Sequence, residues 1–498
     1  MTIRLLSPIF GHAYEKICAD TLARWHRLLG DNVHFSTGLD EHGKKIERIA
    51  KKNNKPPKEF VDEMSVPFLK LCSVLGISFD DFIRTTEPRH EKAVLEIFRR
   101  ISAKGDVYKG FYEGSYCVEC ETYYSSDELV GNNCPVHEKP VELLKEESYF
   151  FRMGSYQKKL VLFIEKNPDY LLPKEKRNEI LGRLKAPLRD LSISRASFDW
   201  GIRMPNDKSH IFFVWVDALT NYLTTVGFPG KKSGQFWPAD MHLVGKDIVW
   251  HHTVIWWSLL MSAGLPLPKV FAHGFINLAS GKMSKSRGNV VDPVALSEKY
   301  GCDAVRYFLL REVPFGQDGF FDEQKLVERH NFELANELGN LLNRVLVLVE
   351  KNCGGKIPKA TIDKALAEKL DLASFRNAMG KLELHFALAH VMAFVKVCNK
   401  YANEKEPWKN SGAAQEKVLY SLADSLRIVG ILLSPFLPQT SEKILCSLGV
   451  KSATFKGCRF NLLSVGTKIE RGEVLFKKIV LNQKELLMVK VQNLPIFL

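Results

Sequence analysis

The sequence predicts an α/β protein in which a parallel sheet is interrupted by a small metal-binding insertion and followed by an all-helical domain. Three observations support this fold class. Strand, turn and helix patterns succeed one another near the start of the chain and again before residue 275, as they do in parallel sheets. Cysteines and a histidine cluster between residues 117 and 137. From about Asp322 onward, apolar residues recur at helical spacing.

The composition is that of a globular protein with a polyanionic partner. The 498 residues suffice for about two to four domains, and 45% of them are apolar. The formal net charge of +13 favours nucleic acid as the partner, with an anionic membrane surface as the second candidate. No apolar run is long enough to span a membrane, and no targeting segment is visible. Most of the ten cysteines are isolated in the sequence, which indicates a reducing compartment.

The first α/β repeat carries two polar candidates. Thr2–Leu6 is expected to be a strand, and His12 then opens a helical pattern, where an N-terminus would favour phosphate. Val33–Phe35 is expected to be a strand that runs into Thr37–Gly43, which places Asp40 at a strand end. The alternatives are a capping or surface role for His12 and a helix N-cap for Asp40.

A metal-ligand spacing interrupts the α/β pattern. Cys117-x-x-Cys120 is followed after thirteen residues by Cys134-Pro-Val-His137. Two short ligand pairs separated by a hairpin-length loop are typical of tetrahedral zinc. Four protein ligands leave no open position, so the spacing predicts one structural zinc ion, with a chance cluster of thiols as the alternative.

A second set of strands follows this insertion. Ile211–Val216 is expected to be a buried strand, and His242–Ile248 and Val270–Phe275 are expected to be strands that end in turns. Parallel strands present their carboxyl ends at one edge, which would gather Asp40, Lys246, Asp247, His273 and the loop at 281–289. If the turn after the first of these strands is helical, one face would carry Trp215, Ala218 and Tyr222, with simple core packing as the alternative.

The stretch Gly281–Asn289 places three cations between two glycines. With Lys282, Lys285 and Arg287, a mobile loop could close on a polyphosphate. The alternative is a basic surface loop or a localisation tag. Neither G-x-x-x-x-G-K-[ST] nor G-x-G-x-x-G occurs in the sequence, which argues against a P-loop NTPase and a standard dinucleotide-binding enzyme.

The predicted helices after Asp322 have one apolar stripe and a separate polar side. The stripe consists of Ala335, Leu338, Leu342, Val345 and Val349. Asn340 and Arg344, four residues apart, lie away from this stripe and could face a ligand together. Trp408 is predicted either as a platform for a nucleotide base or as a core or lid residue.

Together these motifs resemble those of the methionyl-tRNA synthetases, which are class I aminoacyl-tRNA synthetases, in the bacterial and organellar form with a single zinc knuckle. Lys282–Ser286 matches the second signature sequence of that class, KMSKS. Thr37–Gly43 resembles the family's T-G-T-D-E-H-G, with Leu39 in place of a threonine. The remaining matches are the four knuckle residues, Val214–Ala218, Gly245–Ile248, Asn340-x-x-x-Arg344 and Asn403–Trp408. The resemblance covers about residues 5 to 445.

The resemblance implies a methionine–tRNA ligase that uses Mg²⁺-bound ATP to convert L-methionine to methionyl-adenylate and transfers it to tRNA(Met). The catalytic residues would be Lys282, Lys285 and His12. The ATP-binding residues would be Gly11, His12, Gly245, Asp247, His273, Gly274, Lys282, Ser284 and Lys285. Methionine would be bound by Asp40, Trp215, Ala218, Tyr222, Ile248 and His252. The anticodon would be read by Asn340, Arg344 and Trp408, and one Zn²⁺ held by Cys117, Cys120, Cys134 and His137.

The same resemblance implies a Rossmann-like parallel-sheet catalytic domain with an inserted zinc-knuckle connective domain, followed by an all-α anticodon-binding bundle. The expected boundaries are 1–105 and 206–275 for the catalytic halves, 106–205 for the insertion, 276–325 for the KMSKS loop and stem-contact region, 326–448 for the bundle and 449–498 for a tail of unclear structure. A soluble monomer or homodimer is expected, in the cytoplasm or an organelle matrix, without membrane association.

The match is incomplete at the N-terminus. The family's first signature sequence is H-I-G-H or a close variant, and Gly11–Tyr14 matches only its second half, directly after Ser7–Phe10. The first histidine and a pocket tyrosine are missing, which should misplace the helix N-terminus that faces the ATP phosphates. The alternative to an active ligase is therefore an impaired tRNA-binding relative or an aberrant isoform. A leucine, isoleucine or valine specificity is a weaker rival, because the large editing insertion that it predicts is missing.

Overall fold

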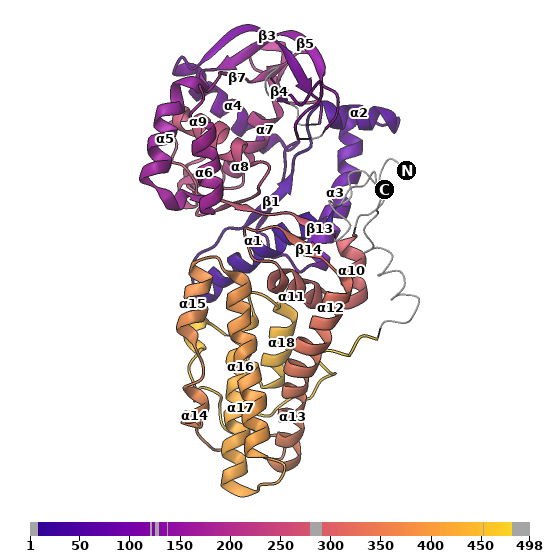
Figure 1. Cartoon of the computed structure of the whole chain (residues 1–498), viewed down its shortest axis with the longest axis vertical. Helices are drawn as coiled ribbons and strands as arrows, with labels where there is room; N and C mark the ends of the chain where they lie inside the picture. The colour runs from indigo at the N-terminus through magenta and orange to yellow at the C-terminus, as the bar shows by residue number, and fades with distance from the viewer. Residues whose placement is uncertain are drawn as a thin grey trace. The chain divides into compact units, whose positions relative to one another are not determined.

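The computed structural model describes residues 8–119, 122–124, 129–136, 138–278, 291–451 and 453–480. These residues form two compact units, each assembled from separate stretches of the chain. The first unit contains residues 36–69 and 79–273, and the second contains residues 8–35, 70–78 and the chain from 274 onward. Figure 1 labels the helices and strands of both units.

Two short parallel sheets form the α/β part of the first unit. One pairs β1 (Ser36–Leu39) with β2 (Asp81–Arg84), and the other has the order β11 (His242–Gly245), β12 (Val270–His273), β6 (Leu171–Leu172). The parallel pairing confirms the predicted α/β class. Within the described ranges no strand joins the two sheets, and the predicted strand Thr2–Leu6 lies outside those ranges.

The prediction of a strand at Val33–Phe35 was wrong by a few residues, because the strand begins at Ser36. A Cβ atom at Gly38 would lie 2.0 Å from the carbonyl oxygen of Ile83 on the neighbouring strand. The two strands approach this closely only because glycine lacks that atom. The pairing that defines β1 therefore depends on Gly38 and not on the alternating residues before it.

Helices pack against these strands around one large apolar core, and the first two of them form a separate small cluster of Ile49, Ala50, Phe60, Val61 and Met64. They are α2 (Lys44–Lys52), α3 (Pro57–Val74), α4 (Pro88–Ala103), α5 (Gln157–Lys166), α6 (Lys174–Arg183), α7 (Val214–Leu219), α8 (Asn221–Thr224), the π-helix η6 (His251–Ile255) and α9 (Trp256–Ala263). Short 3₁₀ segments are η3 (Met153–Tyr156), η4 (Pro168–Tyr170) and η5 (Lys231–Gln235). Helices α4 and α9 contact each other in this core, to which Ile97, Trp256 and Trp257 contribute fully buried side chains.

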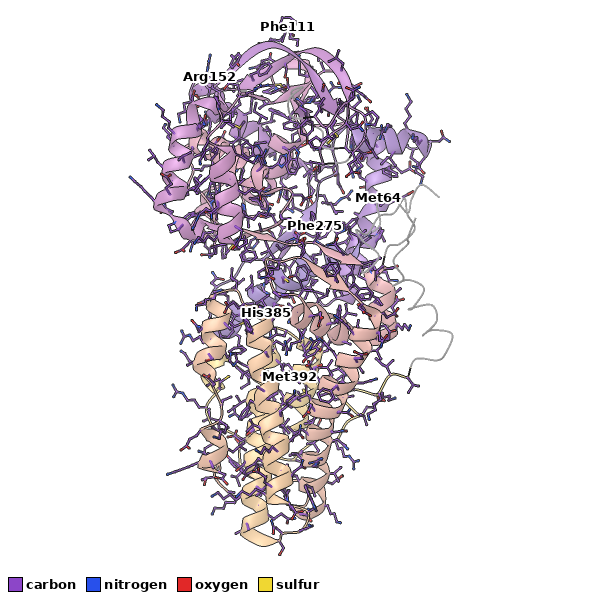
Figure 2. All side chains as sticks on the ribbon, viewed as in Figure 1. Met64, Phe111, Arg152, Phe275, His385 and Met392 are labelled. Carbon is purple, nitrogen blue, oxygen red and sulfur yellow. The ribbon has the colours of Figure 1, made fainter. Side chains whose placement is uncertain are left out.

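A long antiparallel hairpin is the main feature of the insertion. It consists of β3 (Val107–Cys117) and β5 (Glu142–Phe151), flanked by β4 (Thr122–Tyr124) and β7 (Leu191–Ser192) in the order β4-β3-β5-β7. The hairpin arches over the helices of this unit (Figure 1). Phe111 stands on the outer curve of the hairpin (Figure 2), and 76% of its side chain is exposed.

The expected strand at Ile211–Val216 is only partly correct. Strand β10 (Asp207–Phe212) lies between β8 (Ser194–Arg195) and β9 (Arg203–Met204) in an antiparallel sheet, and helix α7 begins at Val214. The apolar run therefore spans the buried end of a strand and the buried start of a helix. Periodicity alone does not separate these two structures.

The second unit combines a small parallel pair with a helical bundle. The pair is β13 (Ile276–Leu278) with β14 (Gly319–Phe321), and the helices near it are α1 (Phe10–Leu29), α10 (Pro293–Tyr300), α11 (Cys302–Glu312) and α12 (Glu323–Arg329). The bundle contains the π-helix η8 (His330–Gly339), α13 (Asn340–Asn352), α14 (Lys364–Ala367), α15 (Leu372–Gly380), α16 (Leu384–Lys405), α17 (Gly412–Leu433) and α18 (Pro438–Ser447). Helices α13, α16 and α17 lie side by side (Figure 1).

The bundle confirms the predicted helical region. Every residue of the predicted apolar stripe is buried: Ala335, Leu338, Leu342, Val345 and Val349. Residues 453–480 contain one short 3₁₀ helix, η9 (Phe455–Gly457), and pair with the linker after α13 through the N–H of Ile357, which donates to the carbonyl of Thr467 at 2.9 Å. Among the described helices, none combines the length and apolar character needed to cross a bilayer.

Candidate functional site

The carboxyl ends of β11 and β12 bring three predicted ATP-binding residues together. Gly245 and His273 are register partners, and the N–H of Lys246 donates to the carbonyl of His273 at 3.0 Å. A Cβ atom at Gly245 would lie 2.7 Å from Oδ1 of Asp247, so the turn folds that carboxylate back over the glycine. These residues and Asp40 were predicted to lie at the edge of one sheet. In the described strands they lie at the edges of two sheets, because Asp40 follows β1.

Three of the predicted methionine-binding residues converge around a fourth, His252. Tyr222 Oη lies 2.8 Å from Nε2 of His252, and Nδ1 of the same ring lies 2.9 Å from the carbonyl oxygen of Ile248. Trp215 is edge-on to this ring, with 6.4 Å between centroids. Ala218 is buried on α7, the helix that also carries Trp215. Trp215 and Tyr222, predicted to share one helical face with Ala218, both contact this ring, but they do so from the consecutive short helices α7 and α8.

Two further histidines complete this aromatic cluster and have no counterpart among the predicted site residues. His242 stacks on Tyr222 and His251 on Trp215, each with 3.8 Å between ring centroids. Burial lowers the pKa of His251 to about 3, and burial together with His252 lowers the pKa of His242 far below its ordinary value. Both rings are therefore uncharged at neutral pH. These two rings and the side chains of Trp215 and Tyr222 form an aromatic environment suited to a soft, polarizable group.

The segment after β1, residues Asp40–Gly43, is called here the Asp40 loop. Its second residue, Glu41, is buried and uses its backbone and carboxylate groups in contacts with Thr85, Trp200, Arg84 and Thr86. Asp40 itself lies at the strand end, as predicted, and it is exposed. The alternative of a helix N-cap for Asp40 was wrong, because the N-cap of α2 is Gly43.

The described half of the predicted zinc knuckle has the features of a ligand site. Cys117 ends β3 and Cys134 lies in a tight turn, and both thiols are buried and outside any disulfide. The N–H of Val136 donates to Sγ of Cys134 at 3.4 Å, a contact that favours thiolate character. The other two predicted ligands, Cys120 and His137, lie outside the described residues.

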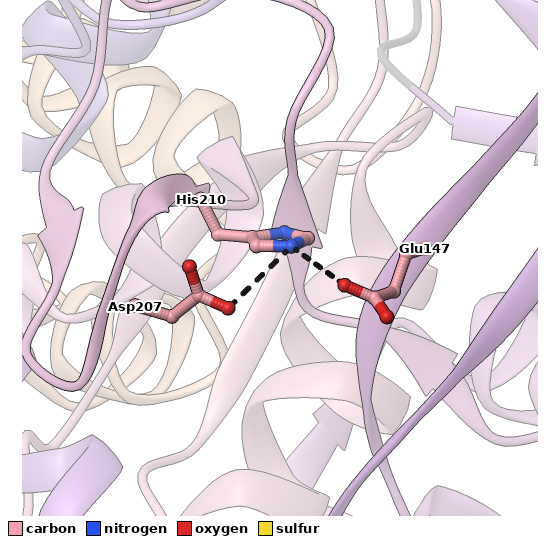
Figure 3. Close-up of side chains that lie close together, drawn as sticks. All are labelled: Glu147, Asp207 and His210. Carbon is pink, nitrogen blue, oxygen red and sulfur yellow. Dashed lines mark ion pairs between the residues drawn. The ribbon is translucent and has the colours of Figure 1, made fainter.

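A second group of potential metal ligands proves to be an ion-pair cluster. Glu147, Asp207 and His210 point toward one another (Figure 3). The ammonium group of Lys109 already lies 2.6 Å from Glu147 and 3.1 Å from Asp207. Nε2 of His210 is 3.7 and 3.8 Å from these carboxylates. Because a cation of the protein occupies the carboxylates, the cluster ties β10 to the hairpin and provides no metal site.

In the second unit, the shortened first signature still opens a helix. Gly11 and His12 lie in the first turn of α1, and Nδ1 of His12 accepts the backbone N–H of Ile9 at 3.1 Å. The capping role considered for His12 is therefore observed. Position 274 requires a glycine for packing, because a Cβ atom there would lie 2.2 Å from the carbonyl of Gln317. The KMSKS residues Lys282, Ser284 and Lys285 lie outside the described residues.

Two of the three predicted anticodon residues, Arg344 and Trp408, lie together in the helical bundle. The guanidinium of Arg344 donates to Oδ1 of Asn403 at 2.7 Å and lies over the Trp408 ring, 5.6 Å from its centroid. Asn340 is exposed one helical turn before Arg344. The side chain of Trp408 is 45% exposed, so its prediction as a core residue was wrong. An exposed indole beside a cation and two amides is suited to unpaired bases.

Two protein-family models match the sequence. A model described as class I tRNA synthetases (M) matches residues 7–142 and 133–346. A model described as the anticodon binding domain of methionyl tRNA ligase matches residues 354–492. Together the two models extend over nearly the whole chain.

Curated relatives and solved structures agree with these models. The methionine–tRNA ligase of Caldanaerobacter subterraneus subsp. tengcongensis is 46% identical over 503 residues, covering 96% of this chain and 79% of the relative. The methionine–tRNA ligase of Brucella suis biovar 1 is 46% identical, and the alignment covers 95% of this chain and 95% of the relative. The Mycobacterium tuberculosis methionyl-tRNA synthetase in complex with methionyl-adenylate superimposes with a TM-score of 0.91 at 41% identity, over 94% of this chain and 97% of that one. The chain therefore belongs to the methionine–tRNA ligases, a family of class I aminoacyl-tRNA synthetases.

Proposed function

We propose that this chain activates L-methionine with ATP and transfers the methionyl group to tRNA(Met). The observation that carries the proposal for this chain is the cluster of Trp215, Tyr222 and His252, bounded by two uncharged histidines. Such a pocket accepts a thioether, whose sulfur makes favourable contacts with aromatic rings. A charged side chain would pay for desolvation there without a partner.

The amino and carboxylate ends of methionine require contacts outside this cluster. Asp40 is exposed at the end of β1 and carries the negative charge that an ammonium group requires. With the amino acid held by both ends, its carboxylate oxygen attacks the α-phosphorus of ATP. The bond to the bridging oxygen breaks, and pyrophosphate leaves with the electron pair. Orientation and charge stabilisation supply the catalysis, and no covalent enzyme intermediate is needed.

The residues assigned to the nucleotide come from the ends of β11 and β12, from the start of α1 and from the KMSKS sequence. Gly245, Asp247, His273 and Gly274 would contact the nucleoside, and Gly11 and His12 would face the phosphates from the start of α1. Lys282, Ser284 and Lys285 would hold the negative charge that develops on the phosphates. Mg²⁺ bound with ATP would neutralise part of the phosphate charge.

The second step transfers the methionyl group to RNA. A ribose hydroxyl of the terminal adenosine of the tRNA attacks the carbonyl carbon of the adenylate, and AMP leaves. The exposed group of Asn340, Arg344 and Trp408 would select the tRNA by its anticodon. One structural Zn²⁺ would be held by Cys117, Cys120, Cys134 and His137, where it would stabilise the knuckle.

Methionine-dependent ATP–pyrophosphate exchange by the purified full chain tests the first step. Exchange is expected with methionine and not with leucine, isoleucine or valine. The family similarities give no support to an impaired relative. Absence of exchange in a chain that still binds tRNA would overturn the proposed activity and favour that alternative.

The tRNA contacts are tested separately with Trp408→Ala. Loss of one base-stacking platform costs about 1–3 kcal/mol, so the KM for tRNA(Met) in aminoacylation should rise about five- to a hundredfold. Exchange without tRNA should not change. The matched control is Phe386→Ala, which removes a similarly exposed aromatic side chain from the same unit and should alter neither assay.

A further inference from the structure

The carboxylate of Asp217 on α7 is fully buried between two histidines from distant parts of the first unit. Its Oδ2 lies 2.7 Å from Nδ1 of His42, and its Oδ1 lies 2.7 Å from Nε2 of His90. Both Asp217 and His90 have no exposed side-chain surface, and that of His42 is 8% exposed. A carboxylate only accepts hydrogen bonds, so each ring nitrogen that faces it carries a proton. The other nitrogen of His90 lies 2.9 Å from the hydroxyl oxygen of Thr224 on α8.

The charges of Asp217 and His42 support each other. Burial alone would raise the pKa of Asp217, but His42 and His90 hold it below its ordinary value. Burial alone would lower the pKa of His42, but Asp217, with Asp40 and Glu41, raises it. Both shifts favour the ion-paired form of the two groups. Breaking a buried pair leaves one charge without compensation, which is strongly unfavourable.

His42 belongs to the Asp40 loop, and further hydrogen bonds fix the backbone of this loop. The N–H of Glu41 donates to Thr85 at 2.9 Å, and its carbonyl accepts the indole N–H of Trp200 at 2.6 Å. The N–H of Gly43 donates to the carbonyl of Trp200 at 3.1 Å. The loop is thus tied to β2 and to Trp200 by its second and fourth residues. The third residue of the loop, His42, connects it to α7 through the contact with Asp217.

Helix α7 carries two residues assigned to the thioether pocket on either side of Asp217. Trp215 precedes it by two residues and Ala218 follows it directly. The contact between His42 and Asp217 therefore connects the segment that presents Asp40 with the helix that presents Trp215. Neither His42 nor Asp217 needs to touch the substrate for this connection to matter.

We propose that Asp217 is a positioning residue for methionine: by binding His42 and His90, it fixes the Asp40 loop against α7 and sets the distance between the amino-group contact and the thioether pocket. The proposal rests on the proposed function, which assigns Asp40 and Trp215 to the two ends of methionine. A small displacement of one contact relative to the other costs binding, because both ends of the amino acid must be satisfied at once.

The first test is Asp217→Asn in the full chain, measured by ATP–pyrophosphate exchange. The amide keeps the shape of the carboxylate but turns an N–H₂ group toward a ring N–H donor. The KM for methionine should rise about tenfold or more, while the KM for ATP stays within about twofold. A merely structural role would reduce the amount of active protein and leave the KM for methionine unchanged. That result would overturn the proposal.

A double-mutant cycle tests whether Asp217 acts through the Asp40 loop. Methionine binding is followed by intrinsic tryptophan fluorescence, which does not depend on turnover. In an Asp40→Ala background, Asp217→Asn should weaken binding by no more than about twofold, because the contact that it positions is already absent. An undiminished effect in this background would contradict the proposal.

Two controls keep the outcome decisive. Asp424→Asn removes the charge of another fully buried aspartate, paired with Arg427 at 2.7 Å in the second unit, and should leave the KM for methionine unchanged. If Asp217→Asn fails to fold, His42→Gln and His42→Leu replace it. The glutamine retains an N–H donor and should stay near the wild-type KM, while leucine should raise it. Equal KM values for the two variants would overturn the proposal.

The positioning role and the proposed function fail in different ways. If the unaltered chain shows no methionine-dependent exchange and no fluorescence response to methionine, the proposed function is wrong. If the unaltered chain is active and Asp217→Asn leaves its KM for methionine unchanged, only the positioning role is wrong.

Discussion

The hydroxyl of Tyr222 lies 2.8 Å from Nε2 of His252, and the opposite ring nitrogen lies 2.9 Å from the carbonyl oxygen of Ile248. A carbonyl only accepts, so Nδ1 carries a proton. In the neutral ring Nε2 then accepts, and the proton of Tyr222 is directed to His252. The backbone of the turn after β11 thereby sets the direction of the hydrogen bond in the proposed thioether pocket.

Tyr222→Phe should weaken methionine binding by removing this donor. The variant leaves a buried nitrogen of His252 without its hydrogen bond, which costs about 1–3 kcal/mol. If the ring reorients as a result, the KM for methionine in the exchange assay should rise about tenfold, with a smaller change for ATP.

Tyr420→Phe is the matched control for this substitution. The hydroxyl of Tyr420 donates to the carbonyl of Leu463 at 3.1 Å in the second unit, and its loss should not alter the KM for methionine. Equal effects of the two variants on that KM would exclude a specific role for the Tyr222–His252 contact.

Metal analysis of freshly purified protein should find about one zinc ion per chain. Cys134→Ser should lose the metal and lower the melting temperature of the first unit, because a site that exists only in the folded state contributes its binding free energy to folding. Cys398→Ser is the control: this thiol is fully buried in α16, where burial raises its pKa to about 12, and its loss should leave the zinc content intact. Zinc retained in full by Cys134→Ser would remove this residue from the ligand set.

Local patterns were sufficient for the class of fold and for the neighbourhood of a few proposed site residues. The helical stripe that includes Leu342 and Val345 is buried, and Trp215, Tyr222 and His252 meet as expected. These predictions depend on residues a few positions apart, or on motifs that carry their own geometry.

The parts that could not be predicted are contacts between distant residues. His42 and His90 meet Asp217 across 175 and 127 positions of the chain. No local period relates them, and each of the three residues alone has an ordinary explanation as a surface or core residue. The boundary between β10 and α7 was missed for a different reason. Both are buried at that point, so the apolar run through Phe212 and Val214 continues across the change of structure.

The second unit is tied together by a buried arginine, which gives a prediction about stability. Arg306 on α11 has no exposed surface and pairs with Asp20 of α1 at 2.8 Å. Its guanidinium also donates to the carbonyls of Phe436, Leu75 and Pro435 at 2.7 to 3.1 Å. One side chain thus connects α1, the turn before β2 and the turn between α17 and α18.

Arg306→Met should destabilise the second unit by about 3–5 kcal/mol, because it leaves the Asp20 carboxylate and three carbonyls without this partner. Denaturant unfolding measures the change. Lys400→Ala is the control, since the exposed pair between Lys400 and Glu404 at 3.7 Å should contribute less than about 1 kcal/mol. If the two variants were equally stable, the buried pair would contribute no more to stability than the exposed pair.

The pH dependence of stability should report the His42–Asp217 pair. The pKa of His42 is raised in the folded protein, so its contribution is fully present below the unfolded pKa of about 6.5 and is lost as the pH rises through the folded value. The pKa of Asp217 is lowered, so its contribution is present above about 3.8 and is lost as the pH falls through the folded value. Between these limits both groups are charged and the pair stabilises the first unit. His90, Asp40 and Glu41 are the other titratable groups that face the pair.

His42→Leu removes the titrating partner and should therefore destabilise the first unit more at pH 6 than at pH 9, because the stabilisation from the charged imidazole decreases as the pH rises above about 6.5. Urea unfolding of both proteins at the two pH values measures the difference, and His26→Leu is the control. His26 pairs with Asp31 at 2.8 Å, but both side chains are more than half exposed. Solvent screens that pair, so its loss should change stability little at either pH. A destabilisation by His42→Leu that is the same at pH 6 and pH 9 would mean that the imidazole acts only as a neutral hydrogen-bond donor to Asp217.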